Sequence, residues 1–70
     1  MDYSSIIKER RKSVGITQED LADMAGISLS YLKMIEQRKA NPTIQIIEQV
    51  LDCLGMQLNV AIKQPHLNQE

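Results

Sequence analysis

Apolar residues recur every three or four positions through most of this chain, a spacing that gives a helix one hydrophobic face. Four stretches show the pattern, and each is bounded by residues that start or stop helices. We therefore predict four helices, over residues 3–14, 18–25, 29–37 and 43–54. The first, second and fourth are followed by glycines that can end a helix with a left-handed backbone, namely Gly15, Gly26 and Gly55.

Polar residues stand at the expected starts of the helices. Thr17 and Ser28 can each accept a hydrogen bond from a backbone N–H of the turn that follows. For the last helix we predict Asn41 as the N-cap and Pro42 as the first helical residue, a position that proline favours. These caps place the helix boundaries independently of the hydrophobic pattern.

The pattern changes to strict alternation after the fourth helix, which is typical of a half-buried β-strand. We predict a strand over 57–63, followed by a tail over 65–70. A single strand leaves backbone groups unpaired, so we expect it to pair antiparallel with the same strand of a second copy. The apolar face of the last helix is wider than one core-facing stripe requires. The expected dimer contacts are Ile46, Val50, Cys53, Leu58, Val60 and Ile62.

Only three residues, Gly26, Ile27 and Ser28, separate the second predicted helix from the third. Glycine reaches a positive φ without steric cost, so the backbone can leave the second helix at once. Two helices joined by such a short glycine-containing turn cross at about 90 to 120°, the arrangement of a helix-turn-helix. The turn therefore predicts that the start of the third helix projects outward.

The residues around this turn follow a spaced pattern made of Gln18, Ala22, Gly26, Leu32, Ile35 and the segment IEQRKANPT. In this pattern the chain resembles the Cro and phage-repressor (Xre) family. The resemblance covers about residues 6–55 and implies a mainly α fold with four helices; with the predicted strand added, we expect a domain over residues 1–64. It also implies a homodimer that binds near-palindromic double-stranded DNA. The single cysteine makes a reducing cytoplasm the expected location.

By the same resemblance, the third helix enters the major groove while the second crosses the DNA backbone. The residues that this arrangement places on the DNA are Thr17, Gln18, Ser28, Leu29, Ser30, Tyr31, Lys33, Met34, Arg38 and Lys39. Roles without DNA contact remain open for several of these residues. Thr17 and Ser28 can be caps alone, and Gln18 can be an ordinary exposed glutamine. Tyr31 either stacks near a sugar or covers the second helix, and the three basic residues can form a solvated face.

Two positions depart from the family pattern. Leu29 stands where many relatives carry Gln, Arg or Lys, so it offers at best a contact with a thymine methyl group. Arg38 stands where glycine is common. The resemblance also implies a partly buried ion pair between Arg11 and Glu36; the alternative is that Arg11 lies on the surface with the rest of its basic run.

Charge and residue content exclude several kinds of function. The formal net charge is −1, so the chain lacks the strongly basic background that coats nucleic acid without specificity. Lys63 is the only basic residue beyond position 39, which places the phosphate contacts in the N-terminal part. The single Cys53 has no second thiol or histidine cluster around it, so we expect no metal and no cofactor. No apolar run is long enough to cross a membrane.

These observations favour a homodimeric transcriptional regulator, a repressor that binds DNA sequence-specifically. A four-helix domain that ends in a strand also resembles, in pattern alone, the HipB-like antitoxins, DNA-binding dimers that hold a kinase-like toxin. The alternative is a protein-interaction module with little DNA binding, in which Leu29, Tyr31 and Met34 form an apolar patch. We do not expect an enzyme, because the chain lacks a nucleophile with its base, a phosphate-binding glycine loop and a metal cluster.

Overall fold

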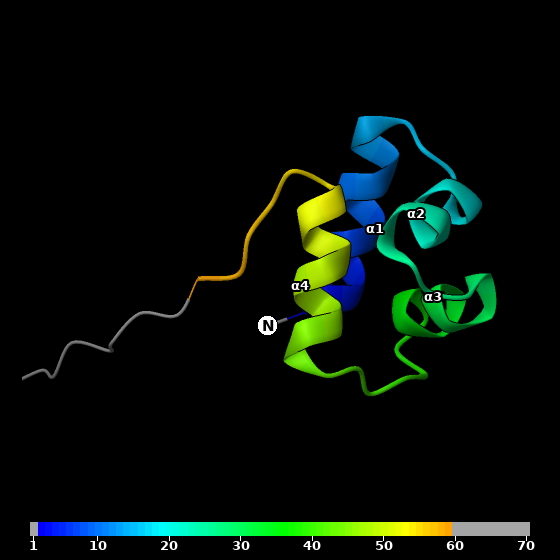
Figure 1. Ribbon diagram of the computed structural model, residues 1–70, viewed down its shortest axis with the longest axis vertical. Helices are drawn as coiled ribbons and strands as arrows, with labels where there is room; N and C mark the ends of the chain where they lie inside the picture. Colours follow the sequence, from blue (N-terminus) through cyan, green and yellow to red (C-terminus); the bar gives the residue numbers. More distant parts are fainter. Residues whose placement is uncertain (1, 60–70) are drawn as a thin grey trace, which may run out of the picture.

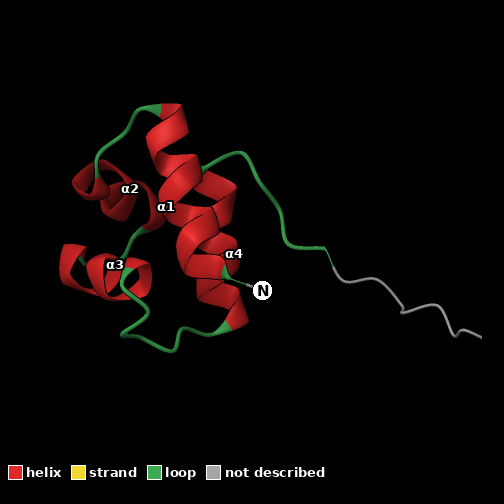
Figure 2. Ribbon diagram, turned by 180° about the vertical axis from the view of Figure 1, so that it is seen from behind, coloured by secondary structure: helices red, strands yellow, loops and turns green. Residues whose placement is uncertain are grey.

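Four α-helices make up the fold in the computed structural model, which describes residues 2–59 (Figure 1). They are α1, Tyr3–Val14; α2, Gln18–Ala25; α3, Leu29–Glu36; and α4, Ile44–Cys53. Both α1 and α2 pack against α3 and against α4, and α3 and α4 lie on opposite sides of the molecule. The prediction of a mainly α four-helix domain is confirmed. Within the described range no segment is a strand (Figure 2).

A polar side chain closes the first turn of every helix. Its oxygen accepts a backbone N–H three residues later, and the four residues concerned are Asp2, Thr17, Ser28 and Thr43. Thr17 forms a reciprocal capping box with Asp20, whose carboxylate accepts the Thr17 N–H at 3.3 Å. The predicted capping roles of Thr17 and Ser28 are therefore confirmed.

The start predicted for the last helix is wrong. Asn41 and Pro42 lie in the loop before α4, and Thr43 is the N-cap, with an extended backbone at φ −71° and ψ 162°. The Thr43 hydroxyl oxygen accepts the Ile46 N–H at 3.2 Å, which fits a helix that starts at Ile44. Proline suits the first helical position, but its fixed φ suits an extended segment before a cap equally well. The threonine hydroxyl decides between the two starts.

A glycine with left-handed backbone caps α1 and α2, and another directly follows Leu54, the C-cap of α4, as the sequence predicted. At the corner between α2 and α3, Gly26 has a φ of 72°. The next N–H, that of Ile27, donates to the Ala22 carbonyl at 3.0 Å, so the chain leaves α2 within one residue. Only Ile27 and Ser28 remain before α3 begins.

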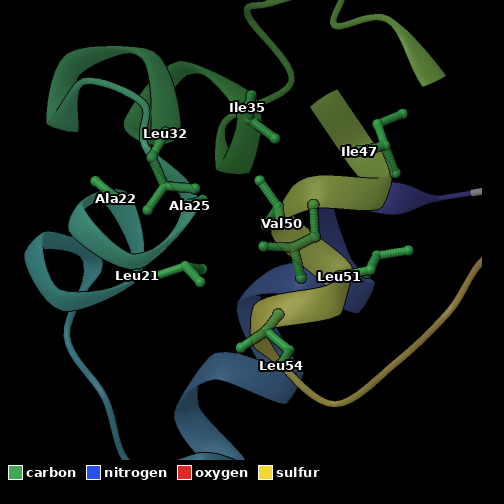
Figure 3. Close-up of a cluster of buried hydrophobic side chains, with 10 residues drawn as sticks. Leu21, Ala22, Ala25, Leu32, Ile35, Ile47, Val50, Leu51 and Leu54 are labelled. Carbon is green, nitrogen blue, oxygen red and sulfur yellow. The ribbon is translucent and has the colours of Figure 1, made fainter. Parts of the chain in front are cut away.

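All four helices contribute to one core (Figure 3). The side chains with 0% of their surface exposed are Ile7, Leu21, Leu32, Ile35 and Val50. Burying one such side chain contributes about 1.5–3 kcal/mol of hydrophobic free energy. Leu32 and Ile35 point inward from the same side of α3, so the opposite side of that helix stays at the surface.

The C-terminal strand stays a prediction. Residues 57–59 carry no strand assignment, and the remaining predicted positions, 60–63, lie outside the described residues. Leu58 is half-buried and packs against the core, while Gln57 and Asn59 on either side of it are exposed. Burial in this short part therefore follows the alternation of the sequence.

Candidate nucleic-acid interface

Helix α3 lies at the surface with one face exposed (Figure 1). Its inner side carries the buried residues Leu32, Ile35 and Glu36. Its outer side carries Ser30, Lys33 and Met34, all exposed. The exposed fraction of Met34, 42%, is large for an apolar side chain in so small a domain. The outer side of α3 is thus open to solvent, as a helix that enters a DNA groove requires.

The first turn of α3 is partly covered by the protein itself. Ser28 is exposed, but its hydroxyl oxygen already accepts the Tyr31 N–H at 3.1 Å. Leu29 and Tyr31 are half-buried and pack against the core. The Tyr31 ring therefore packs against the protein and keeps part of its surface exposed, and its contact with a sugar stays a prediction. Only part of the Leu29 side chain remains accessible to a partner.

The start of α2 offers hydrogen-bond donors without positive charge. Thr17 is exposed, and its hydroxyl oxygen accepts the Asp20 N–H at 3.0 Å. The first backbone N–H groups of a helix have no acceptor within the helix, and in α2 these belong to Gln18 and Glu19. The carboxylates of Glu19 and Asp20 stand in the same turn. A phosphate at this end would be held by backbone N–H groups rather than by charge.

Gln18 is turned toward the inside of the molecule. Its Nε2 donates to Oε1 of Glu36 at 3.0 Å, and its side chain is half-buried. Glu36 also pairs with Arg11, whose Nε lies 2.8 Å from Oε2 and whose Nη2 lies 3.1 Å from Oε1. Nη1 of Arg11 donates to the Ile16 carbonyl at 3.0 Å. Side chains from α1 and α2 therefore meet at one carboxylate of α3.

This ion pair is buried and fully hydrogen-bonded. Only 10% of the Arg11 side chain and 2% of the Glu36 side chain are exposed. The hydrogen bond to Glu36 raises the pKa of Arg11 above its ordinary value; burial opposes this, and charge attraction adds to it. Among the described residues no buried side-chain nitrogen or oxygen lacks a partner. The pair thus fixes α3 against α1 behind the exposed face.

The end of α3 carries an arginine where the other helices end in glycine. Arg38 has a φ of 62°, the one positive value at a non-glycine residue between positions 2 and 59. Its N–H donates to the Ile35 carbonyl at 3.2 Å, and the Lys39 N–H donates to Met34 at 2.8 Å. These are the two bonds of a Schellman motif. The Arg38 guanidinium pairs with the carboxylate of Asp2, and Lys39 is exposed.

Asp2 is a charged neighbour of this surface that sequence reasoning missed. Its carboxylate accepts the Ser5 hydroxyl at 2.9 Å and the Ser5 N–H at 3.3 Å, besides pairing with Arg38. The hydrogen bonds from Ser5, and to a smaller extent the contact with Arg38, hold the pKa of the Asp2 carboxyl below its usual value. An aspartate just before a helix indicates a cap, but no local pattern links positions 2 and 38.

The basic run of α1 does not form one patch. Arg11 is buried, and Nε of Arg10 donates to the Leu54 carbonyl at 2.9 Å, at the end of α4. Lys8 and Lys12 are exposed on α1. The cations carried by α3 and the residues just after it are Lys33, Arg38 and Lys39.

The fold separates the residues predicted for a dimer contact. Val50 is completely buried in the core and offers no surface to a second copy. Ile46 and Cys53 are half-buried on α4, and Leu58 is half-buried beyond it. The other two predicted contacts, Val60 and Ile62, lie outside the described residues. Ile44, which the prediction did not include, is 64% exposed on the same helix.

Within residues 2–59, no three side chains of the types His, Cys, Asp and Glu come together as metal ligands would. Burial, and to a smaller extent the charge of Asp52, raise the pKa of the Cys53 thiol. None of the helices in this range is long and apolar enough to cross a bilayer.

Comparison with known proteins agrees with this geometry. The helix-turn-helix family model matches residues 7–60, which contain α2, the corner and α3. The immunity repressor protein of Bacillus phage phi105 is 38% identical over 70 residues, which are 100% of this chain and 49% of the repressor. The HTH-type transcriptional regulator SinR of Bacillus subtilis (strain 168) is 36% identical over 61 residues, 86% of this chain and 55% of SinR.

A third relative is more distant. The HTH-type transcriptional regulator PuuR of Escherichia coli (strain K12) is 29% identical over 59 residues, 84% of this chain and 32% of PuuR. The chain spans about half the length of the phage repressor and of SinR. The similarity therefore covers most of this chain but only part of each of these relatives.

Proposed function

The chain belongs to the helix-turn-helix family of the Cro and phage-repressor type, and from this premise we propose that it binds double-stranded DNA as a transcriptional repressor. One observation carries the proposal. The outer face of α3 is exposed while its inner face is fixed to the core and to α1. The names of the two relatives, an immunity repressor protein and an HTH-type transcriptional regulator, support the regulatory role, and the exposed face of α3 supports binding to DNA.

The base contacts come from the outer face of α3 in the major groove. Ser30 and Met34 lie one helical turn apart, so both can reach base edges from the same side of the helix. A serine hydroxyl can donate to or accept from a base, and a methionine offers apolar contact. Leu29 and Tyr31 contribute only what their packing leaves exposed.

The phosphate contacts come from both ends of the same surface. Lys33, Arg38 and Lys39 supply charge on and after α3, and the backbone N–H groups at the start of α2 supply donors. One N–H of the Gln18 amide is bound to Glu36, which leaves the second for a phosphate. Because the net charge of the chain is −1, affinity depends on these local contacts.

The test is binding of the full chain to duplexes selected from a random library, at several salt concentrations. Lys39→Ala is expected to weaken binding to all sequences alike and to reduce the salt slope by about one. Ser30→Ala is expected to alter preference at one base pair, by about 1–3 kcal/mol, with the slope unchanged. Glu48→Ala, an exposed change on α4, serves as the control that leaves both quantities alone.

Two results would contradict the proposal in different ways. If Lys39→Ala and Ser30→Ala act identically on every duplex, α3 does not lie in the groove as described. If no duplex is bound at about 50 mM salt, where phosphate contacts are strong, DNA is not the partner. Capture of a protein through the patch of Leu29, Tyr31 and Met34 would then favour the protein-interaction module.

A homodimer is the form in which we propose that the chain binds DNA. The exposed Ile44 and the partly exposed Ile46 and Cys53, which flank the core-facing residues of α4, leave apolar surface of this helix accessible to a second copy. A two-fold dimer would read two half-sites and add the affinity that one small domain lacks.

The predicted strand can be tested by measuring the dimerisation constants of Ile62→Asp and Ala61→Asp by sedimentation equilibrium. Alternation puts only Ile62 on the inner face of the strand, so only Ile62→Asp should weaken the dimer. Equal dimerisation of the two variants would exclude strand pairing.

An antitoxin role is a separate hypothesis that rests on the predicted strand alone. Its test is a search for a kinase-like toxin encoded beside the gene, followed by co-purification of the two proteins. A repressor that purifies and binds DNA without such a partner would contradict it.

A further inference from the structure

We propose that Asp2 competes with a DNA phosphate for Arg38, so that this ion pair lowers the affinity of the interface for every DNA sequence. The inference rests on the proposed function and deepens it, because it assigns to the same surface a residue that sets its strength. Asp2 precedes α1 and Arg38 follows α3, and only the fold brings their side chains together.

The first step concerns the backbone of Arg38. The Schellman bonds at the end of α3 require a left-handed residue and make no use of its side chain. The three other helices place glycine at the equivalent position. A side chain in this conformation strains the backbone, and such strain commonly marks functional positions. The left-handed backbone therefore does not account for an arginine at position 38. The position of its guanidinium, at the edge of the α3 surface, does account for it.

The second step concerns accessibility. The Arg38 side chain is 65% exposed and the Asp2 side chain 41%. A guanidinium carries five N–H donors, and only Nη2 of Arg38 bonds to Asp2. Exposed ion pairs add little to the stability of a fold, so this one can open readily. A phosphate can therefore reach Arg38 from solvent.

The third step concerns charge. The hydroxyl and the N–H of Ser5 hold the Asp2 carboxylate in place independently of Arg38. A phosphate at Arg38 must then displace this carboxylate from the guanidinium and remain close to its negative charge. Like charges within a Debye length, about 10 Å at 0.1 M salt, repel one another. Phosphates carry no sequence information, so the penalty applies to all duplexes equally.

Asp2→Asn isolates this effect. Asparagine caps a helix as well as aspartate does, so the start of α1 is kept while the charge is removed. The dissociation constant for duplex DNA is expected to fall about threefold to tenfold at low salt, the effect of one nearby charge in a well-solvated site. The gain should shrink as salt increases, and the order of preference among duplexes should not change.

A double-mutant cycle separates competition for Arg38 from a general change in net charge. In an Arg38→Ala background, Asp2→Asn is expected to bring little or no gain. Glu48→Gln removes one exposed negative charge from α4, outside the proposed interface, and is expected to leave affinity nearly unchanged. Thermal unfolding of each variant checks that the fold is intact.

Each other result overturns the inference. An equal gain from Asp2→Asn with and without Arg38 would show a general charge effect. An unchanged affinity, with normal binding by the unaltered chain, would exclude the competition and leave the proposed function standing. Failure of every variant and of the unaltered chain to bind DNA would overturn both.

Discussion

Two arginine–carboxylate pairs connect the α1 region with the end of α3, and they differ in exposure. The side chains of Arg11 and Glu36 are 10% and 2% exposed and share two hydrogen bonds. Those of Arg38 and Asp2 are 65% and 41% exposed. Burial removes water and salt from the first pair, so the fold depends on it. The second pair is exposed, so a competing anion can reach its guanidinium. The Arg38 guanidinium can therefore bind a DNA phosphate.

The turns before and after α3 also differ, in backbone strain. Gly26 and Arg38 both have left-handed backbones after a helix, at φ values of 72° and 62°. Glycine adopts this conformation without strain, whereas arginine carries a Cβ that opposes it. The corner that orients α3 is therefore relaxed, and the corner that carries the charge is strained.

The largest expected effect comes from breaking the buried pair. Glu36→Ala should lower the free energy of unfolding by about 3–5 kcal/mol, because it leaves the Arg11 charge buried without its partner. It also removes the acceptor of Gln18. Urea unfolding followed by circular dichroism measures the loss. Glu19→Ala, at an exposed position of α2, is the matched control. A loss below about 1 kcal/mol would place this pair with ordinary surface pairs.

The next effect comes from the relaxed corner. Gly26→Ala should destabilise the fold by about 1–2 kcal/mol through the positive φ alone. A Cβ at this position would meet no atom within 4 Å, so no clash adds to the strain. The same unfolding assay applies. If the variant is as stable as the unaltered chain, the contrast between the two corners disappears.

At the strained turn after α3, a substitution is expected to increase stability. Arg38→Gly should raise the free energy of unfolding by about 1 kcal/mol, because glycine accepts the left-handed backbone freely. At the same time it should weaken DNA binding by removing a phosphate contact. Stability and affinity measured on one preparation reveal this exchange. A variant that loses stability would show that the arginine side chain supports the fold.

The smallest effect concerns the acidity of Asp2. Its pKa lies below the usual value chiefly because of Ser5, so Ser5→Ala should raise it more than Arg38→Ala does. Because the folded pKa is depressed, the stabilising contribution is present above the unfolded pKa and is lost as pH falls through the folded one. NMR titration of the Asp2 carboxyl carbon measures its pKa in each variant. A larger rise in Arg38→Ala would make the ion pair, rather than the cap, the main cause.

The local signals in the sequence were sufficient for most of the fold. Hydrophobic spacing located all four helices, and glycine marked the ends of three of them. They failed at Asn41 and Pro42, because proline suits both the first turn of a helix and the extended segment before it. The hydroxyl of Thr43, which forms the actual cap, stood one residue further on.

The candidate site was predictable only in part. The outward position of Ser30, Lys33 and Met34 follows from the inward position of Leu32 and Ile35 on the same helix. The inward turn of Gln18 could not be inferred, because it depends on a carboxylate 18 positions away. The complete burial of Val50 also escaped prediction, since a broad apolar face does not reveal which part meets the core.

What the sequence determined by itself is the set of helices, their caps and the short corner, because these depend on interactions between residues at most a few positions apart. What only the tertiary structure decided is which charges meet. The Arg11–Glu36 pair spans 25 positions and was implied by the family resemblance alone, and the Arg38–Asp2 pair spans 36 and was not expected. Charge pairing depends on distance in space and on exclusion of water, and neither quantity exists until the helices have packed.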